Sequence, residues 1–136
     1  MASVQAIGRL IVRENQRGMA SGRIFLAGFS QGGAVAYTTA LTYPEKLAGV
    51  IALSAYLPNP VRVAEEASEA NKAIPVFAAH GREDQVLSIE MGRAARDFLV
   101  HHGYRVQWLE YLMPHSVCPE EIDAIGTWLG DRMAER

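Results

Sequence analysis

Apolar residues follow two alternating patterns along this chain. Four short runs are almost continuously apolar, which is typical of strands buried on both faces of a parallel sheet. Between these runs, apolar residues recur every three or four positions, which predicts helices with one apolar face. The four runs, and therefore the four predicted strands, cover residues 23–29, 49–54, 74–79 and 106–113.

Helices are predicted before, between and after these strands. The first is predicted from the helical spacing of apolar residues at positions 4, 7, 10 and 11, and Gly18 can end it. Further helices are predicted over residues 34–43, 88–102 and 119–133, with a loop and a short exposed helix over residues 57–72. In the helix over residues 88–102, the residues expected to face inward are Met91, Ala94, Ala95, Phe98 and Leu99. In the helix over residues 119–133, they are Ile122, Ile125 and Leu129.

The order of these elements predicts the fold class. A helix followed by repeated strand–helix units indicates an α/β protein with a mostly parallel sheet of about four strands, flanked by helices. No linker, internal repeat or low-complexity tract interrupts the pattern. We therefore expect residues 1–136 to form a single domain, a size that allows a real hydrophobic core.

Composition and charge argue against several classes of function. The 136 residues are 49% hydrophobic and 21% charged, as in ordinary globular proteins. The net charge is −2 and no basic run is present, which argues against nucleic-acid binding. No apolar stretch approaches 18 residues, so no membrane span is expected. Cys118 is the only cysteine, and the N-terminus does not resemble a signal peptide, so a cytoplasmic protein without a disulfide framework is predicted.

The most specific motif is Gly28-x-Ser30-x-Gly32, between a predicted strand and a predicted helix. A serine on such a sharp turn has a strained backbone and an exposed hydroxyl, and we expect Gly28 and Gly32 to remove steric clashes around it. The backbone amide of Gln31 lies at the helix N-terminus, where it can stabilise an oxyanion. Ser30 is therefore the candidate nucleophile.

A serine nucleophile needs a base, and the base needs an orienting acid. In a parallel sheet such groups gather past the carboxyl ends of the strands. Asp84 follows the third predicted strand and His115 follows the fourth. The chain order Ser30, Asp84, His115 is that of the α/β-hydrolase arrangement, so these three residues are predicted to form a catalytic triad.

Other residues compete for these roles. Glu83 is the rival acid, one position before Asp84. His101 and His102 lie at a predicted helix C-terminus, where a structural role is expected. His80 is expected to pack the loop that carries Asp84. Cys118 is close to His115 in sequence, but the motif around Ser30 makes a cysteine nucleophile the weaker interpretation.

At these residues the chain resembles the bacterial carboxylesterase, phospholipase and acyl-protein thioesterase family of α/β-hydrolases. The matching blocks are residues 24–34, 52–54, 80–86 and 113–117. The resemblance implies hydrolysis of small carboxylic esters or thioesters without a cofactor, and the four histidines and the cysteine show no spacing that predicts a metal site. It also implies Ser30 as nucleophile, Asp84 as orienting acid and His115 as general base.

The chain departs from this family before Ser30. Members of the family carry additional N-terminal strands, and a His-Gly-rich loop after one of them supplies the other half of the oxyanion hole. Residues 1–22 hold no such strand or loop, so the chain looks like the C-terminal portion of a hydrolase. Two functions stay open: a serine hydrolase, or a weak or inactive fragment that forms a homo-oligomer through its exposed sheet edge. A flavodoxin-like binding domain is the remote third interpretation.

Overall fold

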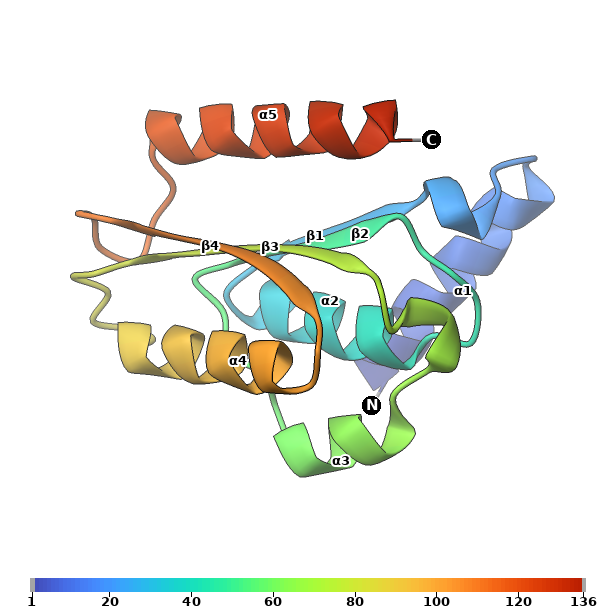
Figure 1. Cartoon of the computed structure of the whole chain (residues 1–136), viewed down its shortest axis with the longest axis horizontal. Coiled ribbons are helices and arrows are strands. Elements are labelled where there is room, and N and C mark those ends of the chain that lie inside the picture. Colours follow the sequence, from blue (N-terminus) through green and yellow to red (C-terminus); the bar gives the residue numbers. More distant parts are fainter. Residues whose placement is uncertain (1, 136) are drawn as a thin grey trace.

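The computed structural model describes residues 2–135 and has one parallel four-stranded sheet. Its strands are β1 (Phe25–Phe29), β2 (Gly49–Leu53), β3 (Pro75–Gly81) and β4 (Arg105–Tyr111). They are hydrogen-bonded in the order β1-β2-β3-β4, with every neighbouring pair parallel (Figure 1). The predicted fold class is therefore confirmed.

The helices alternate with the strands as the sequence pattern predicts. None of them, within residues 2–135, is long and apolar enough to cross a membrane. Their bounds are α1 (Ala2–Gln16), α2 (Gln31–Thr42), α3 (Pro60–Glu66), α4 (Ile89–His101) and α5 (Pro119–Ala134), with short 3-10 turns η1 (Ser21–Arg23) and η2 (Glu69–Asn71).

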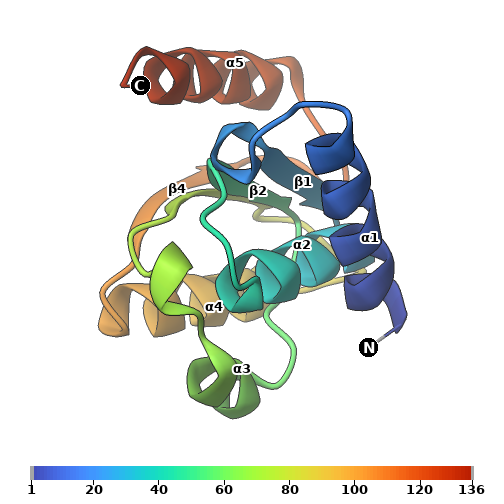
Figure 2. The same ribbon diagram turned by 90° about the vertical axis from the view of Figure 1, so that its right-hand side faces the viewer.

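The sheet is covered on both faces, but unequally. Helices α2 and α4 lie on one face, with α1 beside α2, whereas α5 lies alone on the other face (Figures 1 and 2). Successive strand residues point to opposite faces, so Val50 and Val76 belong to the core beneath α2 and α4. Phe77 packs instead against Trp128 of α5, with ring centroids 5.9 Å apart.

Three details of the expected packing are wrong. Met91 and Ala94 are exposed, because α4 turns Gly92, Ala95 and Leu99 toward the sheet instead. The other correction concerns α5, where Ile122 is 58% exposed. With only the sheet beneath it, an isolated helix buries a narrow stripe of residues, and this stripe contains Glu121 and Trp128.

Strand β1 is the edge of the sheet, and no strand within residues 2–135 lies beyond it. A groove of about 260 Å³ runs between this edge, α1 and α2. Leu10, Ile24, Leu26 and Val35 are among the apolar side chains that line it. Ile24 and Leu26 are only partly buried, whereas Val50 is fully buried in the core between the sheet and α2. The groove is therefore an apolar surface beside an open strand.

Candidate active site

Ser30 occupies a strained turn between β1 and α2. Its φ of 58° and ψ of −120° are unusual for a residue with a side chain. The turn is held by the Ser30 amide, which donates to the Leu53 carbonyl at 2.8 Å, and by the Gly33 amide, which donates to the Ser30 carbonyl at 3.0 Å. These bonds fix the strand-to-helix geometry that the motif predicts for this serine.

Glycine is required at two positions beside the turn. A Cβ atom at Gly28 would collide with the backbone of Gly32, and one at Gly33 would come within 2.5 Å of the Ala55 Cβ. A Cβ at Gly32 would meet nothing within 4 Å. Gly28 therefore avoids a clash, as predicted, whereas the same prediction for Gly32 is wrong, because α2 approaches β2 through Gly33.

The loops after β3 and β4 lie side by side, and backbone hydrogen bonds tie them together. The Arg82 amide donates to the Tyr111 carbonyl at 2.8 Å, and the Glu83 amide donates to the Met113 carbonyl at 3.1 Å. This pairing continues the parallel register of the two strands beyond their ends. It places Asp84 next to His115, although 31 positions separate them in sequence.

The structure brings Ser30, Asp84 and His115 into one chain of hydrogen bonds. Nδ1 of His115 lies 2.6 Å from Oδ2 of Asp84, and Nε2 of His115 lies 3.0 Å from Oγ of Ser30. With the imidazole protonated on Nδ1, the ring donates to the carboxylate and Nε2 accepts from the hydroxyl. The Asp84 side chain is fully buried, whereas the His115 side chain is 16% exposed. This arrangement can remove a proton from Ser30.

Asp84 is held in its charged form. Burial acts to raise the pKa of the Asp84 carboxyl, but its hydrogen bonds outweigh that effect and leave the pKa below its ordinary value. The amides of Leu87 and Val86 donate to Oδ1 at 2.8 and 2.9 Å, and His115 donates to Oδ2. An ionised Asp84 can orient the His115 ring and stabilise its protonated form.

His80 supports the acid loop from beneath. Its side chain is fully buried, and Nε2 lies 2.8 Å from the Leu87 carbonyl and 3.4 Å from Oδ2 of Asp84. Because a carbonyl can only accept, Nε2 carries the hydrogen. His80 therefore packs beneath the loop as expected, and the approach of its ring to Asp84 was not predictable from the sequence.

The competing residues occupy other positions. Glu83 is exposed, and Nδ1 of His115 is bonded to Asp84 instead. His101 ends α4, and the exposed His102 follows it, its ring tilted against that of Phe98 with centroids 4.2 Å apart. Cys118 precedes α5 as a half-buried free thiol. Among residues 2–135, no group of three or more histidine, cysteine, aspartate or glutamate side chains is arranged to hold a metal ion.

The surroundings of Ser30 are partly apolar. The ring of Phe29 packs against His115 with centroids 4.7 Å apart, and Phe29 is still 39% exposed. Gln31 begins α2, so its amide has no acceptor within the helix and is free to bind an oxyanion. Further exposed apolar side chains flank the acid and the base in sequence, namely Val86, Leu112 and Val117.

A parallel sheet, a serine on a strained strand-to-helix turn, and an acid and a histidine past later strands together define the α/β-hydrolase class. The sequence profile described as phospholipase/carboxylesterase matches residues 1–131. The chain therefore belongs to the phospholipase/carboxylesterase family, as the resemblance indicates.

Curated relatives agree with this assignment. The chain is 44% identical over 127 residues to acyl-protein thioesterase 1 of Neurospora crassa, a match that covers 91% of this chain and 52% of the relative. It is 38% identical over 143 residues to acyl-protein thioesterase 1 of Cryptococcus neoformans, covering 95% of this chain and 60% of that protein. The chain thus spans between half and three fifths of the length of these relatives.

Solved structures share the fold. The crystal structure of Arabidopsis thaliana SOBER1 superposes with a TM-score of 0.90 at 30% identity, covering 96% of this chain and 62% of that one. The crystal structure of Zea mays acyl-protein thioesterase 2 gives a TM-score of 0.82 at 26% identity, covering 95% and 64%. The arrangement of helices and strands described above is therefore also found in part of larger proteins.

Proposed function

We propose that this chain carries the catalytic machinery of a serine hydrolase that cleaves carboxylic esters or thioesters of small acyl substrates. The hydrogen-bonded series Ser30, His115, Asp84 is the observation that carries this proposal. The names of the relatives, acyl-protein thioesterase and probable carboxylesterase, support an acyl ester or thioester as the substrate class.

In the proposed reaction, Oγ of Ser30 attacks the acyl carbonyl carbon while Nε2 of His115 takes the hydroxyl proton. The charge on the carbonyl oxygen is stabilised by the backbone amide of Gln31. The tetrahedral intermediate collapses, and His115 gives its proton to the departing alcohol or thiol. Water then attacks the acyl-serine ester by the same route, which releases the acid and restores Ser30.

The apolar side chains near the triad favour an apolar acyl group. Phe29 packs on His115 and remains partly exposed, so a hydrocarbon chain next to Ser30 can cover it. Within residues 2–135, the one charged side chain that forms a hydrogen bond with His115 or Ser30 is Asp84, which is already paired with His115. The cytoplasmic location stays a prediction from the sequence.

Gln31 supplies only one oxyanion donor in this proposal. Losing one donor typically reduces turnover about 100- to 1000-fold, so the Gln31 amide is expected to contribute strongly to the rate. The alternative function, a weak or inactive hydrolase that self-associates, is favoured by one observation. Strand β1 is an open edge beside an apolar groove, and such an edge can pair with a second copy.

Hydrolysis assays distinguish the two functions. Purified chain is assayed with p-nitrophenyl acetate and with a short acyl thioester, alongside Ser30→Ala. A hydrolase gives activity that the substitution abolishes, whereas a fragment acting only by association gives equal background rates for both proteins. Ser116→Ala is the matched control, because Ser116 is an exposed serine next to His115, and its loss should leave the rate unchanged.

A further inference from the structure

A second cavity lies at the opposite end of the sheet from Ser30 and His115. It has a volume of about 260 Å³ and lies at the amino ends of the strands, where β3 begins with Pro75 and β4 with Arg105. Seven-residue strands rise about 3.3 Å per residue, so roughly 20 Å of sheet separates this cavity from the triad. It is therefore not an extension of the candidate active site.

The walls of this cavity are fixed by buried contacts. The Asn71 side chain, 1% exposed, accepts from the Leu47 amide at 2.8 Å and donates to the carbonyls of Tyr43 and Glu45 at 3.0 and 2.9 Å. These three bonds hold the loop that carries Lys46. Leu47 and Ile74, both nearly inaccessible, form apolar parts of the wall.

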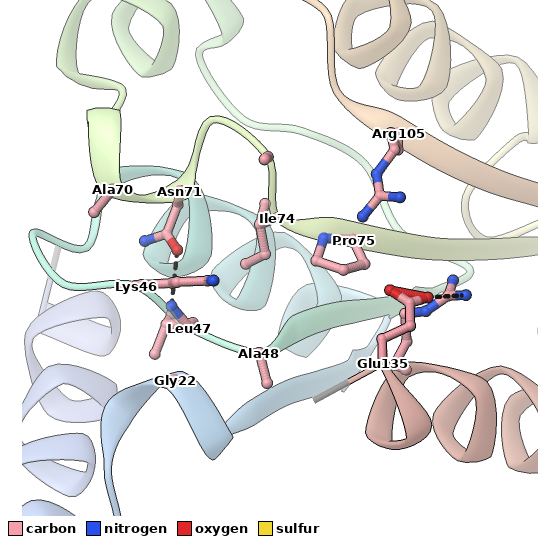
Figure 3. A pocket seen from close by; sticks show the side chains of 12 residues that line it. Gly22, Lys46, Leu47, Ala48, Ala70, Asn71, Ile74, Pro75, Arg105 and Glu135 are labelled. Atoms are coloured by element: carbon pink, nitrogen blue, oxygen red, sulfur yellow. Dashed lines mark hydrogen bonds and ion pairs between the residues drawn. The ribbon is translucent and has the colours of Figure 1, made fainter.

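Cationic side chains dominate the rim. Figure 3 shows the Lys46 ammonium on the side of Ile74 and the Arg105 guanidinium on the side of Pro75, and both residues line the cavity. They come from different elements, the loop before β2 and the first residue of β4. Neither has an ion-pair partner among the salt bridges within residues 2–135.

The charge of Arg132, the third cation on the rim, is already neutralised by an ion pair. Arg132 forms an ion pair with Glu135 at 2.7 Å, the one carboxylate that lines the cavity among residues 2–135, and the negative end of the α5 dipole lies beside it. Lys46 and Arg105 therefore carry the uncompensated charge of this rim, on a chain whose overall net charge is −2. Two unpaired cations above an apolar wall suit an anionic group attached to an organic body.

We propose that this cavity binds a small phosphate monoester, with Lys46 and Arg105 holding the phosphate and Ile74 and Pro75 contacting the organic group. A phosphate is favoured over a single carboxylate because its two charges match two separate cations, and its oxygens fit the planar guanidinium fork. Both cations are exposed, so the affinity is expected to be modest and to fall with added salt.

The test is a titration of isotopically labelled full chain with phenyl phosphate and with inorganic phosphate, at constant low ionic strength, followed by amide NMR shifts. We expect saturable shifts centred on Leu47, Ala48 and Arg105, and tighter binding of phenyl phosphate. The double variant Lys46→Gln/Arg105→Gln should bind about tenfold more weakly, as expected when about 1.4 kcal/mol of contact energy is lost.

The matched control is Arg9→Gln/Arg13→Gln, which removes the same charge from exposed positions on α1. It should bind phenyl phosphate within about twofold of the parent chain, because net charge alone contributes little at this distance. Equal weakening in both double variants would overturn the proposal, since binding would then depend only on total charge. Shifts centred on Ser30, or shifts that do not saturate, would also overturn it. Neither result depends on whether the chain hydrolyses esters.

Discussion

Gly92 of α4 lies so close to His80 that a Cβ atom at position 92 would come within 2.5 Å of Nδ1 of the histidine. The same atom would come within 3.0 Å of the Trp108 ring. The missing side chain at Gly92 thus leaves the space that the buried His80 ring occupies. Since Nε2 of that ring holds the Leu87 carbonyl, a glycine in α4 supports the loop that carries Asp84.

The substitution Gly92→Ala should therefore displace His80 and loosen the acid loop. We expect the free energy of unfolding to fall by about 1–3 kcal/mol from overpacking, and the reaction of Ser30 with a fluorophosphonate to slow. Chemical denaturation and labelling kinetics measure the two effects. Gly126→Ala is the control, because nothing lies within 4 Å of a Cβ there, and alanine should stabilise α5 by about 0.5–1 kcal/mol. Unchanged stability and labelling in Gly92→Ala would contradict the role assigned to this contact.

The Glu121 carboxyl group is buried, and its pKa differs strongly from the ordinary value. It is fully inaccessible, and burial raises the pKa of its carboxyl from 4.5 to about 7, with the Cys118 amide opposing the shift. The pKa of Glu121 is higher in the folded chain than in the unfolded chain. Its contribution to stability is therefore fully present below pH 4.5, where the carboxyl is protonated. This contribution is lost as the pH rises from about 4.5 through 7.

Glu121→Gln should consequently stabilise the chain at pH 8, by about 2 kcal/mol relative to the parent, with a smaller difference at pH 4.5. Denaturation curves at several pH values provide the measurement. The exposed neighbour Glu120 offers the control, and Glu120→Gln should change stability little at any pH. A gain from Glu121→Gln that is independent of pH would show that the carboxyl is not protonated preferentially in the folded chain.

The proximity of the three candidate site residues could be predicted from the sequence, because each lies just past the end of a strand. Ser30, Asp84 and His115 each follow a predicted strand, and parallel strands bring such positions together. The need for glycine at Gly33 and the burial of Glu121 were not predictable in this way. Both depend on how closely a helix approaches a particular part of the sheet, which hydrophobic periodicity does not define.

The choice among the histidines gives a direct prediction. His115→Ala should reduce ester hydrolysis about 1000-fold or more, close to the effect of Ser30→Ala, since the triad acts as a unit. His101→Ala and His102→Ala should stay within about threefold of the parent chain, because both residues are exposed at the end of α4. Initial rates with p-nitrophenyl acetate measure all three. A comparable loss at His101 or His102 would refute the assignment of the base.

Self-association is predicted at the open edge of β1. Burial of the apolar groove contributes roughly 25 cal/mol per Å², so a few hundred Å² can support a dimer at micromolar concentration. We expect sedimentation equilibrium to give a mass above 14.9 kDa for the parent chain and a smaller mass for Leu10→Glu. Val61→Glu, at a more exposed site on α3, is the control and should not dissociate the assembly. A clean monomer at this concentration would contradict the prediction.

Covalent labelling tests the proposed role of Ser30 as the nucleophile. The chain is incubated with a fluorophosphonate probe at neutral pH, and the adduct is located by mass spectrometry of the digest. We expect one adduct per chain, on Ser30, and none in Ser30→Ala. An adduct that persists in Ser30→Ala, or that maps to Ser54, Ser88 or Ser116, would contradict the account, as would a parent chain that is never labelled.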